Sequence, residues 1–233
     1  WGALSTLGVH GSTGTQTTFN NVAGLVDLEL ISNVGSSDIV ALNYSAAVVT
    51  GATDTQTISL NTAAQTLQLV GIETVTATTT GSASTLILTD STGTDILATV
   101  NVSGSANLTL TGTGSTAIKT VSAADMTGKL TLDISASSAN ANTVTGGTGA
   151  DTIDIGAVTS TDTVDGGAGA DTLTIAAATT VANAVGVANV ETLSIVGASG
   201  TVSQDMDAFD ATTISVGANS NNTITLSDLS VTQ

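Results

Sequence analysis

Two nine-residue segments are the parts of this sequence whose residue types and spacing could do chemistry. They are Gly146-Gly147-Thr148-Gly149-Ala150-Asp151-Thr152-Ile153-Asp154 and, twenty residues later, Gly166-Gly167-Ala168-Gly169-Ala170-Asp171-Thr172-Leu173-Thr174. Both match the pattern G-G-x-G-x-D-x-U-x, in which the apolar residue U starts a strand. Glycines permit a tight turn with inward carbonyl oxygens, the aspartate adds a charged oxygen, and Ca²⁺ takes six to eight oxygen ligands. We therefore expect a calcium site formed by Gly146, Gly147, Thr148, Gly149, Asp151, Gly166, Gly167, Ala168, Gly169 and Asp171.

Residues 156–165, between the two segments, form a degenerate copy in which Asp162 is displaced by one position. The intact segments are therefore alternate members, and alternate turns of a two-sheet coil lie on the same edge, about 4.8 Å apart. We expect Asp151 and Asp171 to face one another across a shared cation, with Asp162 and Asp165 as weaker candidate ligands. A turn without metal is the alternative, and the second copy at the coil spacing argues against it.

Two further acidic clusters carry weaker signals. Asp90 and Asp95 belong to a segment that resembles part of a calcium loop, and we keep both as secondary metal candidates. Residues 205–210 group three carboxylates. An ordinary solvated turn is the simpler interpretation of either cluster.

Short apolar-x-apolar segments, which are typical of strands, recur along the chain. From residue 67 they begin at positions 67, 86, 108, 130, 153, 173, 193 and 214, so the period is near twenty. Weaker apolar positions lie midway, which suggests two strands and two turns per period. This pattern predicts a two-sheet solenoid, with the apolar pairs at 86/88, 108/110, 130/132, 153/155, 173/175 and 193/195 stacked in register.

The predicted fold is all-β, a parallel β-solenoid or β-roll with about twenty residues per coil. A β-sandwich is the alternative, because all-β chains commonly have turns every 8 to 12 residues. Spacing is less regular before residue 67, so we divide the chain into an N-terminal β-segment, 1–66, that could pack separately, and a solenoid, 67–233, with its calcium loops at 146–174.

Composition and charge exclude several classes of protein. The 233 residues include 19 Asp and Glu against 2 Lys and Arg, which gives a net charge of −17. Such a chain repels nucleic acids and anionic membrane surfaces, and it contains no run of 18 apolar residues that could insert into a membrane. The 46 Thr and 25 Ser favour strands, and the rarity of aromatic residues predicts a thin aliphatic core.

The nonapeptides resemble those of the RTX proteins, calcium-binding proteins secreted by Gram-negative bacteria. A narrower resemblance, to the large RTX surface-layer proteins, rests on the Thr-, Ala- and Gly-rich composition and on the strand starts Ile72-Glu73-Thr74-Val75 and Val190-Glu191-Thr192-Leu193. The stretch 119–133 also resembles a linking strand pair of that group. This chain has only two intact nonapeptides where fuller members have long tandem runs.

The resemblance implies a structural segment of a calcium-dependent surface layer or extracellular filament. Its implied partner is a second copy of the chain, with a cell-surface polysaccharide as a further candidate. It also implies type I secretion to the bacterial cell surface, and we expect the sequence to be an internal segment of a longer chain. A calcium-stiffened segment of a large RTX adhesin is the alternative.

Enzymatic chemistry has few residues to use. His10 is the only histidine, cysteine is absent, and neither H-E-x-x-H nor G-x-S-x-G occurs. We therefore expect no enzyme activity. Thr-x-Thr pairs such as Thr109-Leu110-Thr111 and Thr143-Val144-Thr145 could form ice-binding ranks, but the sequence predicts no single repeated register for them.

Overall fold

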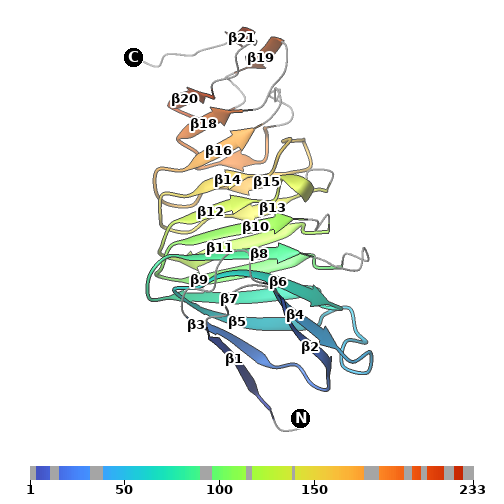
Figure 1. The fold of residues 1–233 in the computed structure, drawn as a ribbon. Helices are drawn as coiled ribbons and strands as arrows, with labels where there is room; N and C mark the ends of the chain where they lie inside the picture. The colour runs from blue at the N-terminus through green and yellow to red at the C-terminus, as the bar shows by residue number, and fades with distance from the viewer. Residues whose placement is uncertain are drawn as a thin grey trace.

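The computed structural model describes residues 4–10, 16–31, 39–89, 96–113, 117–137, 140–175, 184–196, 201–205, 209–217 and 223–227. These residues form an elongated stack of parallel strands (Figure 1) in which the chain alternates between two sheets. Each pair of successive strands makes one coil, so the protein is the parallel β-solenoid that the sequence predicts. The coil averages roughly 22 residues.

The odd-numbered strands up to β17 make a nine-stranded sheet. They are β1 (Thr6–His10), β3 (Asp27–Ile31), β5 (Thr55–Asn61), β7 (Thr74–Thr80), β9 (Thr99–Gly104), β11 (Thr120–Met126), β13 (Thr143–Thr145), β15 (Thr163–Asp165) and β17 (Val187–Ala188).

The even-numbered strands make a ten-stranded sheet. They are β2 (Gln16–Val22), β4 (Ile39–Tyr44), β6 (Ala64–Val70), β8 (Ser84–Thr89), β10 (Leu108–Thr113), β12 (Leu130–Asp133), β14 (Thr152–Asp154), β16 (Thr172–Ile175), β18 (Thr192–Ile195) and β20 (Thr213–Val216). Strands β19 (Thr201–Asp205) and β21 (Thr223–Ser227) pair separately.

The core lies between the two sheets and is aliphatic. Alternate residues of each strand point inward, as in β6, where Leu67 is fully buried and its neighbours Thr66 and Gln68 are partly exposed. Inward Leu, Ile and Val from successive coils stack on one another and form one continuous cluster. Narrow coils leave little room for rings, and Tyr44 and Phe209 are the aromatic members of the described core.

The predicted stacking of the apolar pairs is confirmed as to sheet and is wrong in register at two steps. All six pairs begin in strands of the ten-stranded sheet, with Ile155 just beyond the end of β14, and Leu108 pairs with Leu130 as expected. However, Leu86 pairs with Leu110, and Leu132 pairs with Ile153. Both errors are shifts of two residues, which keep every side chain on its own face because strand side chains alternate with a period of two.

The N-terminal third continues the same two sheets. Strand β6 spans the 66/67 position, and strands on both sides of it pair in parallel within each sheet. The irregular spacing comes from the connections: Leu28 pairs with Ile58 across a coil that contains the 45–54 turn, whereas Ile153 pairs with Leu173. Loop length varies while the strand register is maintained.

Helical structure is almost absent from the described residues. The three-residue 3-10 helix η1 (Ser135–Ser137) is the one helix given for them. No helix in the described ranges is both long and apolar enough to cross a membrane.

Candidate functional site

The two nonapeptides lie on the same edge of the solenoid, in consecutive coils. Residues 146–151 connect β13 to β14, and residues 166–171 connect β15 to β16. We call this edge, where the chain passes from the nine-stranded to the ten-stranded sheet, the Asp171 edge. The degenerate copy connects β14 to β15 on the opposite edge, which we call the Asp162 edge.

Asp151 and Asp171 come together as the spacing predicts. The main-chain N–H of Asp151 donates a hydrogen bond of 2.7 Å to Oδ1 of Asp171. In the same way, Leu130 N–H donates to Asp151 Oδ1 at 2.7 Å. Each aspartate therefore accepts a hydrogen bond from the preceding coil, at the point where the chain turns into a strand. Charged acceptors make such hydrogen bonds short and strong.

Glu191 extends this ladder by one coil, which the sequence analysis missed. Its Oε2 accepts a hydrogen bond of 2.7 Å from Asp171 N–H. Glu191 lies twenty positions after Asp171, so the period itself could have identified it. Glu73 plays the equivalent role on the opposite edge, where its Oε2 accepts from Asp54 N–H at 2.8 Å.

Asp165, at the end of β15, lies beside the second nonapeptide. Its Oδ1 accepts hydrogen bonds from Gly167 N–H at 3.0 Å and from the side-chain amide of Asn189 at 2.7 Å. It therefore joins the carboxylates of the Asp171 edge.

The Asp171 side chain is buried and incompletely bonded. It is 1% exposed, and its Oδ2 has no hydrogen-bond partner among the residues that the structure describes. Burial raises the pKa of the Asp171 carboxyl; the hydrogen bond from Asp151 N–H lowers it, and the negative charges of Asp151, Glu191 and Asp165 raise it further. An orphaned carboxylate oxygen among other carboxylates is suited to a cation.

The glycines of the nonapeptides allow adjacent coils to approach closely. A Cβ on Gly146 would lie 2.1 Å from the Gly166 carbonyl oxygen, and one on Gly166 would lie 1.9 Å from that of Asn189. Gly167 also has a φ of +89°, which side chains rarely adopt. The pattern therefore specifies a glycine-lined stack as well as oxygen ligands.

Main-chain hydrogen bonds already use several groups of the two loops. The N–H of Ala168 donates to the Gly147 carbonyl at 2.9 Å, and the N–H of Thr148 donates to the Met126 carbonyl at 3.0 Å. These contacts hold the x positions of the nonapeptides in register. Gly149 and Gly169 stack likewise, since a Cβ on Gly169 would lie 2.3 Å from the Gly149 carbonyl oxygen.

Asp162, on the opposite edge, is also buried but is fully bonded. It is 2% exposed; its Oδ1 accepts from Asn142 N–H at 2.7 Å, and its Oδ2 accepts from the N–H and hydroxyl of Thr159 at 2.6 and 2.9 Å. The structure thus separates Asp162 from Asp151 and Asp171. Asp90 and Asp95 lie outside the described residues.

The residues of the Asp171 edge fit calcium only if main-chain carbonyls supply most ligands. Within the described residues, no three side chains of the His, Asp and Glu types form a group that could hold a metal ion. The donor set would therefore combine the Asp171 carboxylate with neighbouring carboxylate and glycine-loop carbonyl oxygens. Hard oxygen ligands of this kind are what Ca²⁺ prefers.

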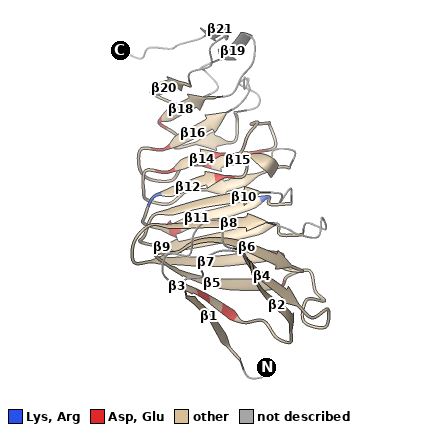
Figure 2. Ribbon diagram, in the orientation of Figure 1, with Lys and Arg blue, Asp and Glu red and all other residues tan. Residues whose placement is uncertain are grey.

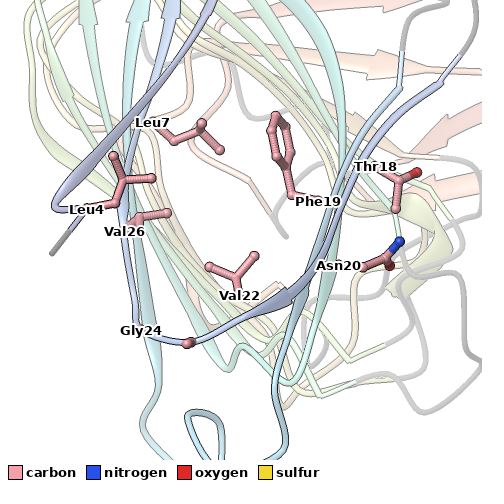
Figure 3. Close-up of a pocket in the computed structure, with 9 residues that line it drawn as sticks. Leu4, Leu7, Thr18, Phe19, Asn20, Val22, Gly24 and Val26 are labelled. Atoms are coloured by element: carbon pink, nitrogen blue, oxygen red, sulfur yellow. The ribbon is translucent and has the colours of Figure 1, made fainter. Parts of the chain in front are cut away.

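A second feature is an apolar pocket of about 290 Å³ at the N-terminal end of the solenoid (Figure 3). Leu4, Leu7, Phe19, Val22 and Val26 point into the space between the first strands. It is the interior of the first coil, and Leu4 is 42% exposed there. The described residues that line the pocket are mostly apolar and include no ionisable side chain. The pocket is therefore a partly exposed part of the hydrophobic core.

We also compared the chain with known proteins. It matches no protein-family model, no curated protein and no solved structure.

Proposed function

We propose that this chain is a calcium-stabilised structural segment of a secreted bacterial surface layer or extracellular filament, which assembles with copies of itself. The observation that carries the proposal is the buried, unpartnered Oδ2 of Asp171 on an edge crowded with carboxylates. The solenoid supplies the second requirement, because a stack of parallel coils is a rigid rod with long sides available for contact.

The calcium part of the proposal follows from the electrostatics of the Asp171 edge. Asp151, Asp165, Asp171 and Glu191 lie close enough for the other three charges to raise the pKa of Asp171. Without a cation, this arrangement is repulsive. Calcium held by Asp171, with carboxylate and carbonyl oxygens of the two glycine loops, would neutralise the charge and bridge successive coils.

The experiment for this part is calcium titration of the chain by calorimetry. The Asp151→Asn, Asp171→Asn double variant should lower the calcium stoichiometry, whereas Asp162→Asn should leave it unchanged. Asp162 is the matched control because it is equally buried but already has all its hydrogen bonds. Equal stoichiometry in all three proteins would refute the site.

The assembly part follows from the net charge. At −17, two copies repel each other unless divalent ions neutralise carboxylates. Calcium at the high concentrations found outside cells would order the chain and permit packing, whereas low cytoplasmic calcium would keep it unassembled and available for type I secretion. Catalysis has no role in this proposal. Cell-surface polysaccharide is a candidate anchor.

Electron microscopy of the purified chain with and without calcium tests assembly directly. Ordered sheets or filaments that form with Ca²⁺ and disappear with chelator are the expected result. Mg²⁺ should be a poor substitute, since it requires tighter octahedral coordination. Single particles at high calcium that bind a host glycan tightly would favour the adhesin alternative.

A further inference from the structure

The outer face of the nine-stranded sheet carries hydroxyl side chains in ranks. The Thr-x-Thr pairs named above still share no single register, because Thr109 lies in the ten-stranded sheet and Thr143 in the nine-stranded sheet. Pairing places six threonines of six successive strands in one rank, from β5 to β15. They are Thr55, Thr74, Thr99, Thr120, Thr143 and Thr163. The sequence hides this rank because the intervals between its members vary with loop length.

A second rank runs parallel to the first, two residues further along each strand. It consists of Thr57, Thr76, Asn101, Ser122 and Thr145, followed by Asp165 on β15. Neighbours along a rank lie about 4.8 Å apart, and the two ranks lie about 7 Å apart, as strand geometry dictates. We call the outer positions of these two ranks on β5, β7, β9, β11 and β13 the threonine face.

The threonine face contains no charged residue, although the chain carries −17. In Figure 2, β5 and β7 contain neither acidic nor basic residues. Asp125, after the bulge in β11, lies beyond the two ranks. The ten-stranded sheet also has a threonine rank, but Asp133 and Asp154 pair in register in its second rank. From β5 to β13 the two ranks of the nine-stranded sheet are therefore uncharged, whereas those of the ten-stranded sheet carry a pair of acids on β12 and β14, although its β6, β8 and β10 are also uncharged.

The side chains of the threonine face are available for contact. Thr55, Thr57 and Thr143 are exposed, and the other members are partly exposed. β-branched side chains are stiff at χ1, so their hydroxyls are ordered in advance. Just beyond the second rank, the hydroxyls of Thr78 and Ser103, in adjacent coils, lie 3.1 Å apart.

We infer that copies of this chain contact each other side by side through the threonine face. The inference rests on the proposed function and names the surface that assembly uses. Two chains of −17 can approach most closely where acids are absent. A hydroxyl both donates and accepts, so the same face can pair with its own two-fold copy. The methyl groups add apolar contact without rings.

The test compares Thr99→Glu with Thr85→Glu in the 233-residue chain. Both residues are partly exposed first-rank threonines on inner strands, one in each sheet, and both lie away from the nonapeptides. A new carboxylate on the contact face should raise the chain concentration needed for calcium-dependent assembly about tenfold or more. Thr85→Glu should assemble like the wild type. Calcium stoichiometry should be unchanged in both.

Cysteine cross-linking gives a second measurement, because the chain has no cysteine of its own. In the assembled state, Thr99→Cys should yield covalent dimers with a short bismaleimide, and Thr85→Cys should not. If wild type and Thr99→Glu assemble equally and both cysteine variants cross-link equally, the inference about the threonine face is wrong. The proposal that the chain assembles with calcium would not be affected.

A wild-type chain that stays monomeric with bound calcium would overturn both the assembly proposal and this inference. If that monomer inhibits ice growth and Thr99→Glu abolishes the inhibition, the threonine ranks bind ordered water and not a second copy of the chain.

Discussion

The two edges of the solenoid place a buried aspartate in two different situations. On the Asp162 edge, three donors from Asn142 and Thr159 satisfy the carboxylate. On the Asp171 edge, the carboxylate accepts one hydrogen bond from Asp151, while its other oxygen is buried and unpartnered. The two aspartates are similarly buried, but the hydrogen bonds of Asp162 are complete within its turn. Asp171 has an oxygen that could still bind a cation.

The neighbours of the two aspartates differ in the same way. A polar loop surrounds Asp162, with Thr159 and Thr161 hydroxyls 2.9 Å apart. Asp171 is followed one coil later by Glu191 and flanked by Asp165. Burial raises the pKa of Asp171, and the charges of Asp151, Glu191 and Asp165 raise it further. These acids accept hydrogen bonds from the main chain, but their like charges repel one another unless a cation neutralises them.

Asp151, in the other complete nonapeptide, has both oxygens bonded, by the N–H groups of Leu130 and Gly147. The unsatisfied oxygen is therefore a property of Asp171 and not of the nonapeptide pattern as such.

The largest expected effect is the destabilisation by Asp162→Ala. The substitution removes three hydrogen bonds to a charged group and leaves the buried N–H of Asn142 without its acceptor. We expect a loss of about 4 kcal/mol in the free energy of unfolding, measured by chemical denaturation. The loss of stability should be the same with calcium and with chelator. A loss seen only in the presence of calcium would indicate that Asp162, like Asp171, belongs to a calcium site.

The second effect is the calcium-dependent part of stability. At a calcium concentration of one hundred times Kd, binding to the native state alone adds about 2.7 kcal/mol. Asp171→Asn should abolish this increment in thermal or chemical denaturation.

In chelator, the same variant should be no less stable than the wild type, because it removes repulsion from Asp151, Glu191 and Asp165. A wild-type melting temperature that does not change between calcium and chelator would contradict the site.

The solenoid could be predicted from sequence because inward residues repeat. Leu173 and Leu193 lie one coil apart in both sequence and space. Register was harder, since Leu132 and Leu130 are equally good partners for Ile153 by pattern alone. The apolar spacing alone does not encode which of the two pairs with it. The threonine ranks were missed for the same reason.

The candidate site was predictable in part. Glycine and aspartate spacing placed Asp151 and Asp171 on one edge, because two turns separated by a whole coil must lie above one another. Spacing marked Asp162 only as a weaker candidate. It could not show that its carboxylate is fully bonded, since that depends on the loop conformation around it. Glu191 was missed as a site residue because the nonapeptide pattern contains no glutamate.

The third prediction concerns the glycine stack of the Asp171 edge. Gly167→Ala should destabilise the protein by about 2 kcal/mol, because φ is +89° and the new Cβ would lie 2.2 Å from the Gly147 carbonyl oxygen. Calcium affinity should fall as well, since the two loops could no longer stack. Gly24→Ala is the control, with no atom within 4 Å of the added Cβ. Equal behaviour of the two variants would show that the loops tolerate separation.

The smallest effect belongs to Asp154, which lies opposite Asp133 on the outer face of the ten-stranded sheet. Burial raises the pKa of Asp154; the hydrogen bond from Gly156 N–H lowers it, and the charge of Asp133 raises it further. A carboxyl whose pKa is higher in the folded than in the unfolded state binds more protons when folded. Its contribution to stability therefore increases as pH falls through the folded pKa.

Asp154→Asn keeps an acceptor for Gly156 and removes the like-charge pair, so it should stabilise the chelated protein by about 0.5 kcal/mol at neutral pH. Denaturation from neutral to mildly acidic pH should show this gain shrinking as the wild-type carboxyl becomes protonated, and a gain independent of pH would assign it to packing instead of charge.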